Sequence, residues 1–349
     1  MKRTDYRKKR QTAKRKTVLK VSMILSLSIV LFVAAYGVFL MKKAEQAADG
    51  AFESVDREKS DLRAEKVKPL THDVSVLFIG VDGTETRGES MEKSRSDALV
   101  LATLNKDDKT VKLVSIPRDS LVYIDKVGYK DKITHAHAFD GTRGSIDAVE
   151  ELLDIPVDYY VEMNFHAFID VVDALGGIEA EVPYERLEKD EFDNYTIQLE
   201  PGFQKLDGQH ALALARTRKL DSDVERGKRQ QMIMEAIVDK ATNVTSISKY
   251  ADVIDALGKN MKTNMTFEDM KSFLGYVKDG KPKMDMLNLE GKDDMSTGIY
   301  YWILDEQNLQ DVQDILKSHL GLKPDTSNMS DASGAGTSNH EYATDSPSQ

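Results

Sequence analysis

The stretch Val74-Ser75-Val76-Leu77-Phe78-Ile79-Gly80-Val81-Asp82 predicts a buried strand that ends at a carboxylate. Continuous apolar, β-branched runs of this length are typical of strands inside a sheet. Two more runs of the same kind, Ala98 to Leu104 and Val111 to Ile116, follow it, with the polar turn Asn105 to Asp108 between them. Three such strands close together in the sequence predict one central sheet.

Apolar residues at helical spacing predict several helices around this sheet. The expected ranges are Ser145 to Leu153, Phe165 to Leu175, Val224 to Thr242, Ser248 to Leu257, Phe267 to Tyr276 and Asp305 to His319. Strands and helices interleave along the chain, so we expect an α/β or α+β fold with a single central sheet.

An uncharged run, Val21 to Leu40, precedes the predicted domain. It is long enough to cross a bilayer as a helix, which takes roughly 20 residues, and it is longer than the apolar region of a cleaved signal peptide. Ten basic side chains and one acidic side chain, Asp5, lie before it, so the positive-inside rule keeps the N-terminus in the cytoplasm. The sequence therefore predicts a single-pass type II anchor in the cell membrane, with the rest of the chain extracellular.

The composition divides the chain into five parts. They are a cytoplasmic basic segment (residues 1–20), the transmembrane anchor (21–40), a polar extracellular stalk (41–72), the main domain (73–321) and a tail (322–349). The tail is rich in Ser, Asp, Thr and Gly, and is expected to be disordered because it has little to bury. The main domain is long enough for one substantial core.

Charge and cysteine content exclude several classes of function. The chain has no cysteine, which rules out a disulfide framework and a cysteine zinc site. Its net charge is −11, and ten of its 48 basic residues lie in the first twenty positions, so the remainder is strongly acidic. Such a domain does not suit general nucleic-acid binding, which needs a basic face. A regulator that binds DNA through the basic N-terminus is an alternative, but that block is already explained as a topology signal.

Two carboxylates are predicted at the ends of neighbouring strands. Asp82 follows the first strand, and Asp97 opens the second in the triplet Arg95-Ser96-Asp97. Carboxylates placed in this way can share a hard cation, and Mg²⁺ usually takes one or two of them together with water and phosphate oxygens. We therefore predict a Mg²⁺ site at Asp82 and Asp97, with Mn²⁺ as the other candidate metal. The alternative is that each Asp is an ordinary strand-end residue.

Arginines follow the third strand and recur later in the chain. Pro117 ends that strand and leaves Arg118 at its rim. In Arg216-Thr217-Arg218, an extended backbone would point both guanidinium groups to the same side. Guanidinium forks can grip phosphate oxygens with two hydrogen bonds, although a rim arginine can also be only a solvated charge.

A helix start follows these arginines. Ser222 and Glu225 fit a capping box, so a helix should begin near Asp223, with Arg226 and Arg229 on one face of its first turns. Helix N-termini attract anions, and a pyrophosphate is a good candidate for the anion. The alternative is a solvated basic patch paired with the acidic residues beside it.

His135 and His137 are spaced as a metal pair could be. No third ligand is visible from spacing, and exposed histidines in a strand or loop are the commoner case.

Short motifs in a fixed order resemble those of one family. They are Ile79-Gly80-Val81-Asp82, Arg95-Ser96-Asp97, Ser115-Ile116-Pro117-Arg118-Asp119, Lys132-Ile133-Thr134, Leu206-Asp207-Gly208, Arg216-Thr217-Arg218 and Arg226 through Gln230. Together they resemble the LytR-CpsA-Psr family over roughly residues 73 to 320. The stretch from Val127 to Pro183 is most similar to the branch that attaches wall teichoic acid. The departures from the family pattern, Thr134 and Ala98, remove no charged group.

The resemblance implies a central mixed sheet flanked by helices, with a prenyl pyrophosphate in a hydrophobic tunnel beside it. The helix predicted from Phe165 to Leu175 could line that tunnel, although core packing is the default reading of its apolar residues. Carried over residue by residue, the resemblance places Asp82 and Asp97 on the metal. It places Arg95, Arg118, Arg216, Arg218 and Gln230 on the pyrophosphate, with Arg226 and Arg87 as further candidates. The expected catalytic residues are Asp82, Arg118, Arg218 and Asp223, of which either aspartate could accept a proton.

The implied activity is that of a polyisoprenyl-teichoic acid:peptidoglycan transferase. Such an enzyme moves a phosphate-linked anionic glycopolymer from its polyprenyl-pyrophosphate carrier to a muramic acid hydroxyl, so its partners are that lipid-linked polymer, peptidoglycan and membrane lipid, without nucleic acid. The alternative is a hydrolase, in which water takes the place of the sugar hydroxyl and the site acts as a pyrophosphatase. The sequence leaves the oligomeric state open.

Overall fold

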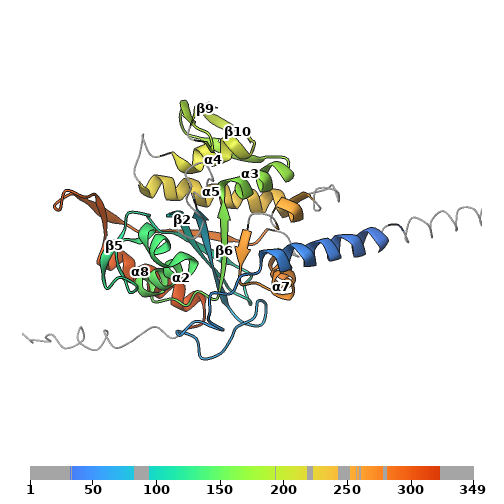
Figure 1. Cartoon of the computed structure of the whole chain (residues 1–349), viewed down its shortest axis with the longest axis horizontal. Helices are drawn as coiled ribbons and strands as arrows, with labels where there is room; N and C mark the ends of the chain where they lie inside the picture. The colour runs from blue at the N-terminus through green and yellow to red at the C-terminus, as the bar shows by residue number, and fades with distance from the viewer. Residues whose placement is uncertain are drawn as a thin grey trace, which may run out of the picture.

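The computed structural model describes residues 34–81, 94–192, 194–217, 223–242, 252–256, 261–277 and 281–322, together with residues 32 and 258. Its centre is a six-stranded mixed sheet in the order β11-β6-β1-β2-β3-β12, with helices on both faces (Figure 1). The predicted α/β fold with a central mixed sheet is therefore confirmed.

The strands of this sheet are β1 (Val74–Val81), β2 (Ser96–Leu104), β3 (Val111–Ser115), β6 (Tyr159–Asn164), β11 (Met261–Thr263) and β12 (Met284–Asn288). The helices are α2 (Ile133–Leu153), α3 (Phe165–Ala174), α4 (Gly208–Arg216), α5 (Asp223–Thr242), α7 (Phe267–Val277) and α8 (Glu306–His319). The remaining named strands form four two-stranded ribbons: β4 (Leu121–Ile124) with β5 (Tyr129–Lys132), β7 (Ile178–Val182) with β10 (Gly202–Leu206), β8 (Arg186–Lys189) with β9 (Tyr195–Leu199), and β13 (Gly291–Asp294) with β14 (Tyr301–Leu304).

Strand direction brings several chain ends to one edge of the sheet. β1 runs parallel to β6 and antiparallel to β2, while β3 runs antiparallel to β2 and parallel to β12. Val81, Ser115, Asn164 and Asn288 therefore end their strands at the same edge, where Ser96 begins β2. We call this the carboxyl edge. In open sheets, ligands usually bind outside the carboxyl ends of the strands.

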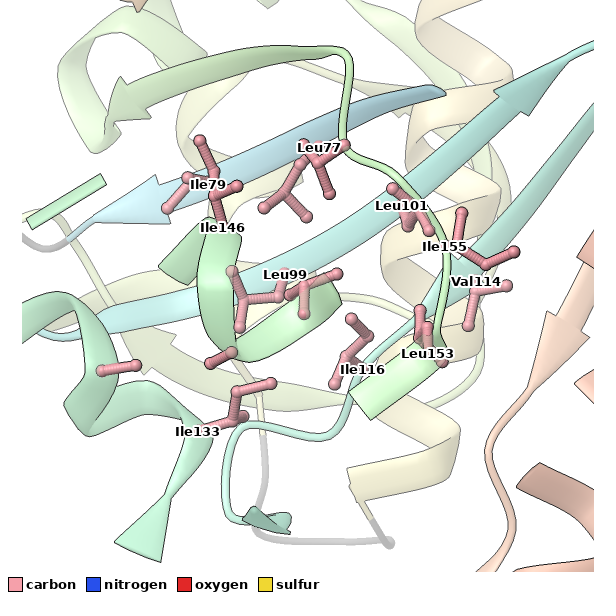
Figure 2. Packing of buried hydrophobic residues seen from close by; sticks show 14 of the residues in the cluster. Leu77, Ile79, Leu99, Leu101, Val114, Ile116, Ile133, Ile146, Leu153 and Ile155 are labelled. Atoms are coloured by element: carbon pink, nitrogen blue, oxygen red, sulfur yellow. The ribbon is translucent and has the colours of Figure 1, made fainter. Parts of the chain in front are cut away.

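One face of the sheet is sealed by α2 and α8. The side chains that β1 and β2 turn to this face, among them Leu77 and Leu101, are completely buried, and they pack with Ile146 and Leu153 of α2 (Figure 2). Burial of each such side chain contributes roughly 1.5 to 3 kcal/mol to stability. The opposite face packs on α5 and α7 through residues such as Met234 and Phe273.

Four of the predicted helices are confirmed to within one residue at each end, namely α3, α5, α7 and α8. Of the range Ser248 to Leu257, residues 252–256 are described and are helical. The predicted helix from Ser145 was too short, because α2 already begins at Ile133. A kink at Asp140 and Gly141 interrupts α2, with Gly141 at φ 60° and ψ −148°, and this break hid the first half from the helical pattern.

The segment before β1 is attached to the domain. Residues 34–51 are helical, and the chain after them has no regular structure but lies against the sheet and α2. Arg57 binds Glu150 at 2.7 Å, and Arg63 binds Asp158 at 2.7 Å, with all four side chains largely buried. Residues 53–72, which the sequence assigns to a stalk, are thus held by ion pairs that no apolar periodicity reveals.

The predicted anchor is only partly described. Residues 1–31 and 33 lie outside the described residues, as does the tail from residue 323 onward. No helix within the described part of the chain is both long enough and apolar enough to cross a membrane.

The fold predicts acid sensitivity through His319 at the end of α8. Its Nδ1 lies 2.8 Å from the Thr103 hydroxyl and its Nε2 lies 2.9 Å from the Thr110 hydroxyl. Burial, assisted by the Lys112 ammonium, lowers the pKa of this imidazole below its ordinary value. The unfolded chain therefore binds the proton more tightly, so the stability contribution is complete above about pH 6.5 and is lost as the pH falls below it.

We expect the thermal unfolding midpoint of the full chain in detergent to decrease when the pH is lowered from 7 to 5. In His319→Gln, whose amide can serve the same hydroxyl groups without titrating, the fall should be smaller. Equal falls in both proteins would assign the acid sensitivity to another group.

Candidate active site at the carboxyl edge

A β-bulge marks the carboxyl edge beside β1. Gly80 pairs with Ala98, but the next residue, Val81, pairs with Ser96, so Asp97 has no partner on β1. Bulges re-aim a side chain and are frequent next to active sites. The bulge leaves the Asp97 side chain partly exposed, in a strand whose later residues are almost all buried.

Arg118 lies against this carboxylate. Its Nη1 hydrogen-bonds Asp97 Oδ1, and both side chains are mostly buried. The turn after β3 that carries Arg118 also carries Asp119, whose Oδ1 is 2.7 Å from Lys132 Nζ. Lys132 ends β5 and lies over the rings of Tyr300 and Tyr301. Two cations and two carboxylates thus stand together at the rim of β2 and β3.

The start of α5 packs directly on the end of β3. Gln230 donates to the Ala215 carbonyl at 3.4 Å and accepts from the Ser115 hydroxyl at 3.4 Å, which joins α5 to α4 and to the sheet. Gly227 faces Ser115 so closely that a Cβ there would lie 2.8 Å from its Oγ. Only glycine lets the helix approach the strand to this distance.

Arg216 ends α4 and stacks on the residue that follows β6. Its guanidinium carbon lies 4.4 Å from the centre of the Phe165 ring, and its Nη1 donates to the Asp190 carbonyl at 2.9 Å. On α5, Arg226 is 4% exposed and Arg229 is 6% exposed. Arg229 Nη2 donates to the Thr217 carbonyl at 2.8 Å. Arg229 therefore ties α5 to the end of α4.

Half-buried apolar residues cross the sheet on the face opposite α2, next to the carboxyl edge. Register makes four of them direct neighbours on successive strands: Ala98, Gly80, Met163 and Met261. Phe78 and Val161, which pair with each other, form the adjacent row and are also half-buried. We call these six residues the apolar strip. Apolar residues in the middle of a sheet are ordinarily fully buried, so the strip is a candidate surface for an apolar ligand.

The structure brings Asp97, Arg118, Arg216 and Gln230 to the carboxyl edge, together with the buried Arg226. Arg95 is exposed just before β2. Asp82, Arg87 and Arg218 lie outside the described residues, and Asp223 begins α5 without a described side chain. The helix start predicted near Asp223 is confirmed.

Two expectations about local structure were wrong. Arg216 is the last residue of a helix and not part of an extended strand, because Asp207 caps α4 by accepting from His210 N and the helix then runs to Arg216. His135 and His137 lie on α2 and not in a strand or loop; His135 binds Asp131 at 2.7 Å, and His137 is completely buried.

Lys132 was not among the predicted site residues, although it stood in one of the motifs. The signal that could have found it is its position at the end of a short strand, directly before an apolar helix start. Among the described residues, no group of three His, Asp or Glu side chains is arranged to hold a metal. Asp97 is the described carboxylate of the predicted pair, and the metal site stays a prediction.

The sequence matches one known protein family over most of its length. The model of the LytR_cpsA_psr family matches residues 38–318. The chain belongs to the LytR_cpsA_psr family. The resemblance inferred from the motifs is therefore confirmed, and the matched region extends upstream to include most of the helix at residues 34–51.

Several curated relatives are named as the same kind of transferase. The polyisoprenyl-teichoic acid–peptidoglycan teichoic acid transferase TagT of Bacillus subtilis is 40% identical over 325 residues, which cover 91% of this chain and 100% of the relative. TagU of the same bacterium, named as the same kind of transferase, is 36% identical over 323 residues, covering 91% of this chain and 99% of the relative.

Solved structures of the family agree with the fold. TagT bound to LIIa-WTA superposes with a TM-score of 0.66 at 37% identity, covering 77% of this chain and 98% of that one. TagT with bound octaprenyl pyrophosphate lipid superposes with a TM-score of 0.62 at 35% identity, again covering 77% and 98%.

The contact between α5 and β3 predicts a steric effect at Gly227. Gly227→Ala places a methyl group 2.8 Å from Ser115 Oγ and 3.0 Å from Ser115 Cβ, so α5 must move away from the strand. We expect a loss of about 1 to 3 kcal/mol, the usual cost of overpacking, measured by urea unfolding of the full chain in detergent. Adding Ser115→Gly removes both crowded atoms. The loss of unfolding free energy in the double variant should therefore be smaller than the sum of the losses in the two single variants. Strict additivity would show that the helix does not depend on this contact.

Proposed function

We propose that this chain transfers a phosphate-linked teichoic acid from a polyprenyl-pyrophosphate carrier to a muramic acid hydroxyl of peptidoglycan. The observation that carries the proposal is the convergence of Arg118, Arg216, Gln230 and Asp97 at the carboxyl edge, beside the apolar strip. The names of the curated relatives and the lipid ligands of the TagT structures support the same chemistry.

The guanidinium groups of Arg118 and Arg216 are suited to a diphosphate. Arg118 is held by Asp97, and Arg216 rests on the Phe165 ring, so both forks are oriented before a ligand arrives. Preorganised donors of this kind stabilise the negative charge that spreads over a phosphoryl group during transfer. Lys132, paired with Asp119, adds a further positive charge at the same rim.

In the proposed reaction, the muramic acid hydroxyl oxygen attacks the phosphorus that bears the glycan. A new P–O bond forms, the bond from that phosphorus to the bridging oxygen breaks, and polyprenyl phosphate leaves. The hydroxyl proton passes to a carboxylate, for which Asp82 and Asp223 are the candidates. The product is a phosphodiester between glycopolymer and peptidoglycan.

A divalent cation fits the chemistry of this edge. Asp97, with Asp82 after β1, would hold Mg²⁺ or Mn²⁺, and the cation would neutralise charge on the diphosphate oxygens. The observation in favour is that the bulge turns Asp97 out of the regular pairing of β1 and β2, so that its carboxylate is partly exposed. Arg118 would then share Asp97 with the metal.

The apolar strip would hold the prenyl chain of the donor. Its residues come from four strands and lie beside the carboxyl edge, so a lipid along the strip would present its head group to the arginines. We further propose that residues 21–40 anchor the chain in the cell membrane with the domain outside, where both the lipid carrier and peptidoglycan are available.

Arg118→Ala tests the assignment of the diphosphate site. Loss of one preorganised donor should lower the rate of glycopolymer transfer on the order of 10²-fold or more, measured with the full chain in detergent, a lipid-pyrophosphate donor and peptidoglycan. Arg143→Ala is the matched control, because Arg143 forms a partly exposed ion pair with Asp147 on α2 and should transfer at the wild-type rate. Unchanged turnover in Arg118→Ala would refute the assignment.

The same assay separates transfer from hydrolysis. With donor alone, a transferase should release polyprenyl phosphate slowly and accelerate when peptidoglycan is added. Rapid release that an acceptor does not affect would favour a pyrophosphatase.

Ala98→Phe tests the lipid role of the apolar strip. Ala98 neighbours Gly80 across the strands, and a ring there would cover the strip without adding charge. We expect the dissociation constant for a long polyprenyl pyrophosphate to rise about tenfold or more, which corresponds to at least about 1.4 kcal/mol. Binding of inorganic pyrophosphate should stay unchanged. Equal weakening of both ligands would show that the substitution disturbs the head-group site instead.

A further inference from the structure

A buried pair of titratable side chains, His137 and Glu162, lies behind the candidate site. His137 of α2 is 0% exposed, and Glu162 of β6 is 1% exposed. His137 Nδ1 lies 2.7 Å from the Ser94 carbonyl oxygen, and its Nε2 lies 3.2 Å from Glu162 Oε2. The Thr142 hydroxyl donates to the same carboxylate oxygen. Neither His137 nor Glu162 has a part in the proposed transfer chemistry.

The two hydrogen bonds limit how His137 can be protonated. A carbonyl oxygen can only accept, so Nδ1 must donate to Ser94. If Nε2 carried no proton, its lone pair would face the Glu162 carboxylate oxygen, which already accepts from Thr142. With an ionised Glu162, both contacts are satisfied together when the imidazole carries two protons and a positive charge. A protonated Glu162 would instead donate to Nε2 of a neutral imidazole.

Glu162 is the counter-ion that this charge requires. Burial acts to raise the pKa of its carboxyl, but hydrogen bonds from His137 and Thr142 and the positive charges of His137 and Lys262 together outweigh it and lower the pKa below its ordinary value. Lys262 lies on the neighbouring strand β11. A buried charge without such a partner would be strongly destabilising, so the two residues depend on each other.

The pair acts on the backbone that carries Arg95 and Asp97. Thr134, three residues before His137 on α2, donates to the Ser96 carbonyl at 2.7 Å. The first turns of α2 therefore hold the carbonyls of Ser94 and Ser96, one on each side of Arg95. Ser94 and Ser96 are buried, while the Arg95 side chain between them is exposed.

We propose that His137, as an imidazolium paired with Glu162, is a positioning residue that fixes residues 94–97 so that Arg95 and Asp97 meet the diphosphate. This inference rests on the proposed function, because it gives the pair a role in the same site. Hydrogen bonds to a charged donor are roughly twice as strong as neutral ones. Without the charge on His137, the Ser94 carbonyl is held less firmly and the segment before the bulge gains freedom.

Glu162→Gln is the decisive variant. The amide keeps the shape of the carboxylate and can donate to Nε2 of a neutral imidazole, so the fold is retained while the charge is lost. His137→Gln removes the imidazole itself. The control is His319→Gln, which changes another buried histidine at the far end of β2, bonded to Thr103.

Ring-nitrogen NMR of the full chain in detergent reports the charge state directly. From its hydrogen bonds to Ser94 and Glu162, we expect His137 to be doubly protonated at pH 7 and to become neutral in Glu162→Gln. Hydrogen exchange of the peptide covering residues 94–97 should be faster in Glu162→Gln and in His137→Gln than in the wild type and the control. Transfer by Glu162→Gln should fall about tenfold or more in kcat/KM, because small misplacements of binding groups are costly.

A neutral His137 in the wild-type protein at pH 7, or unchanged exchange of residues 94–97 in Glu162→Gln, would overturn the inference. Both measurements are independent of activity, so they stand even if the chain proves not to be a transferase. Conversely, loss of transfer in Arg118→Ala with unchanged exchange in Glu162→Gln would retain the proposed function and remove the role of His137.

Discussion

The hydrogen bonding of β1 on both of its sides is the constraint on which the rest of the structure depends. β1 pairs antiparallel with β2 on one side and parallel with β6 on the other. The end of β1 must therefore lie beside the end of β6 and the start of β2. The antiparallel step to β3 adds the end of that strand to the same edge. Residues distant in sequence, such as Asp97, Arg118 and Phe165, therefore come together through backbone pairing. Their own side-chain contacts only adjust the final positions.

The two faces of the sheet are packed differently. The face under α2 is sealed by large aliphatic side chains, and it also holds the buried pair of His137 and Glu162. The other face is fully packed only toward the amino ends of β1 and β6, and it becomes half-buried toward their carboxyl ends. Side chains alternate along a strand, so Leu77 and Ile79 of β1 pack in the core under α2 while Phe78 and Gly80 belong to the apolar strip on the other face.

The helices and strands that could be predicted from the sequence are those whose apolar residues form a continuous run or recur at helical spacing. β1, β2 and β3 are continuous apolar runs, and α3, α5, α7 and α8 have apolar stripes, so these were predicted well. β6 was missed because Glu162 interrupts its apolar pattern, and the burial of that charge depends on His137, twenty-five residues earlier. The arginines and Gln230 were assigned to the candidate site from their motifs, and their role there stays a prediction. The bulge at Asp97, the helical setting of Arg216 and the contact of Lys132 with Asp119 depend on strand register and turn geometry, which no local pattern encodes.

The ion pairs of Arg57 and Arg63 have a practical consequence for anyone who shortens the protein. Glu150 and Asp158 are largely buried, and their positive partners come from the segment before β1. A chain truncated to the start of the sheet would leave the carboxylates of Glu150 and Asp158 without these positive partners. A largely buried charge without a partner lowers stability. A truncated form of this domain should therefore begin upstream of Arg57, so that it includes both Arg57 and Arg63.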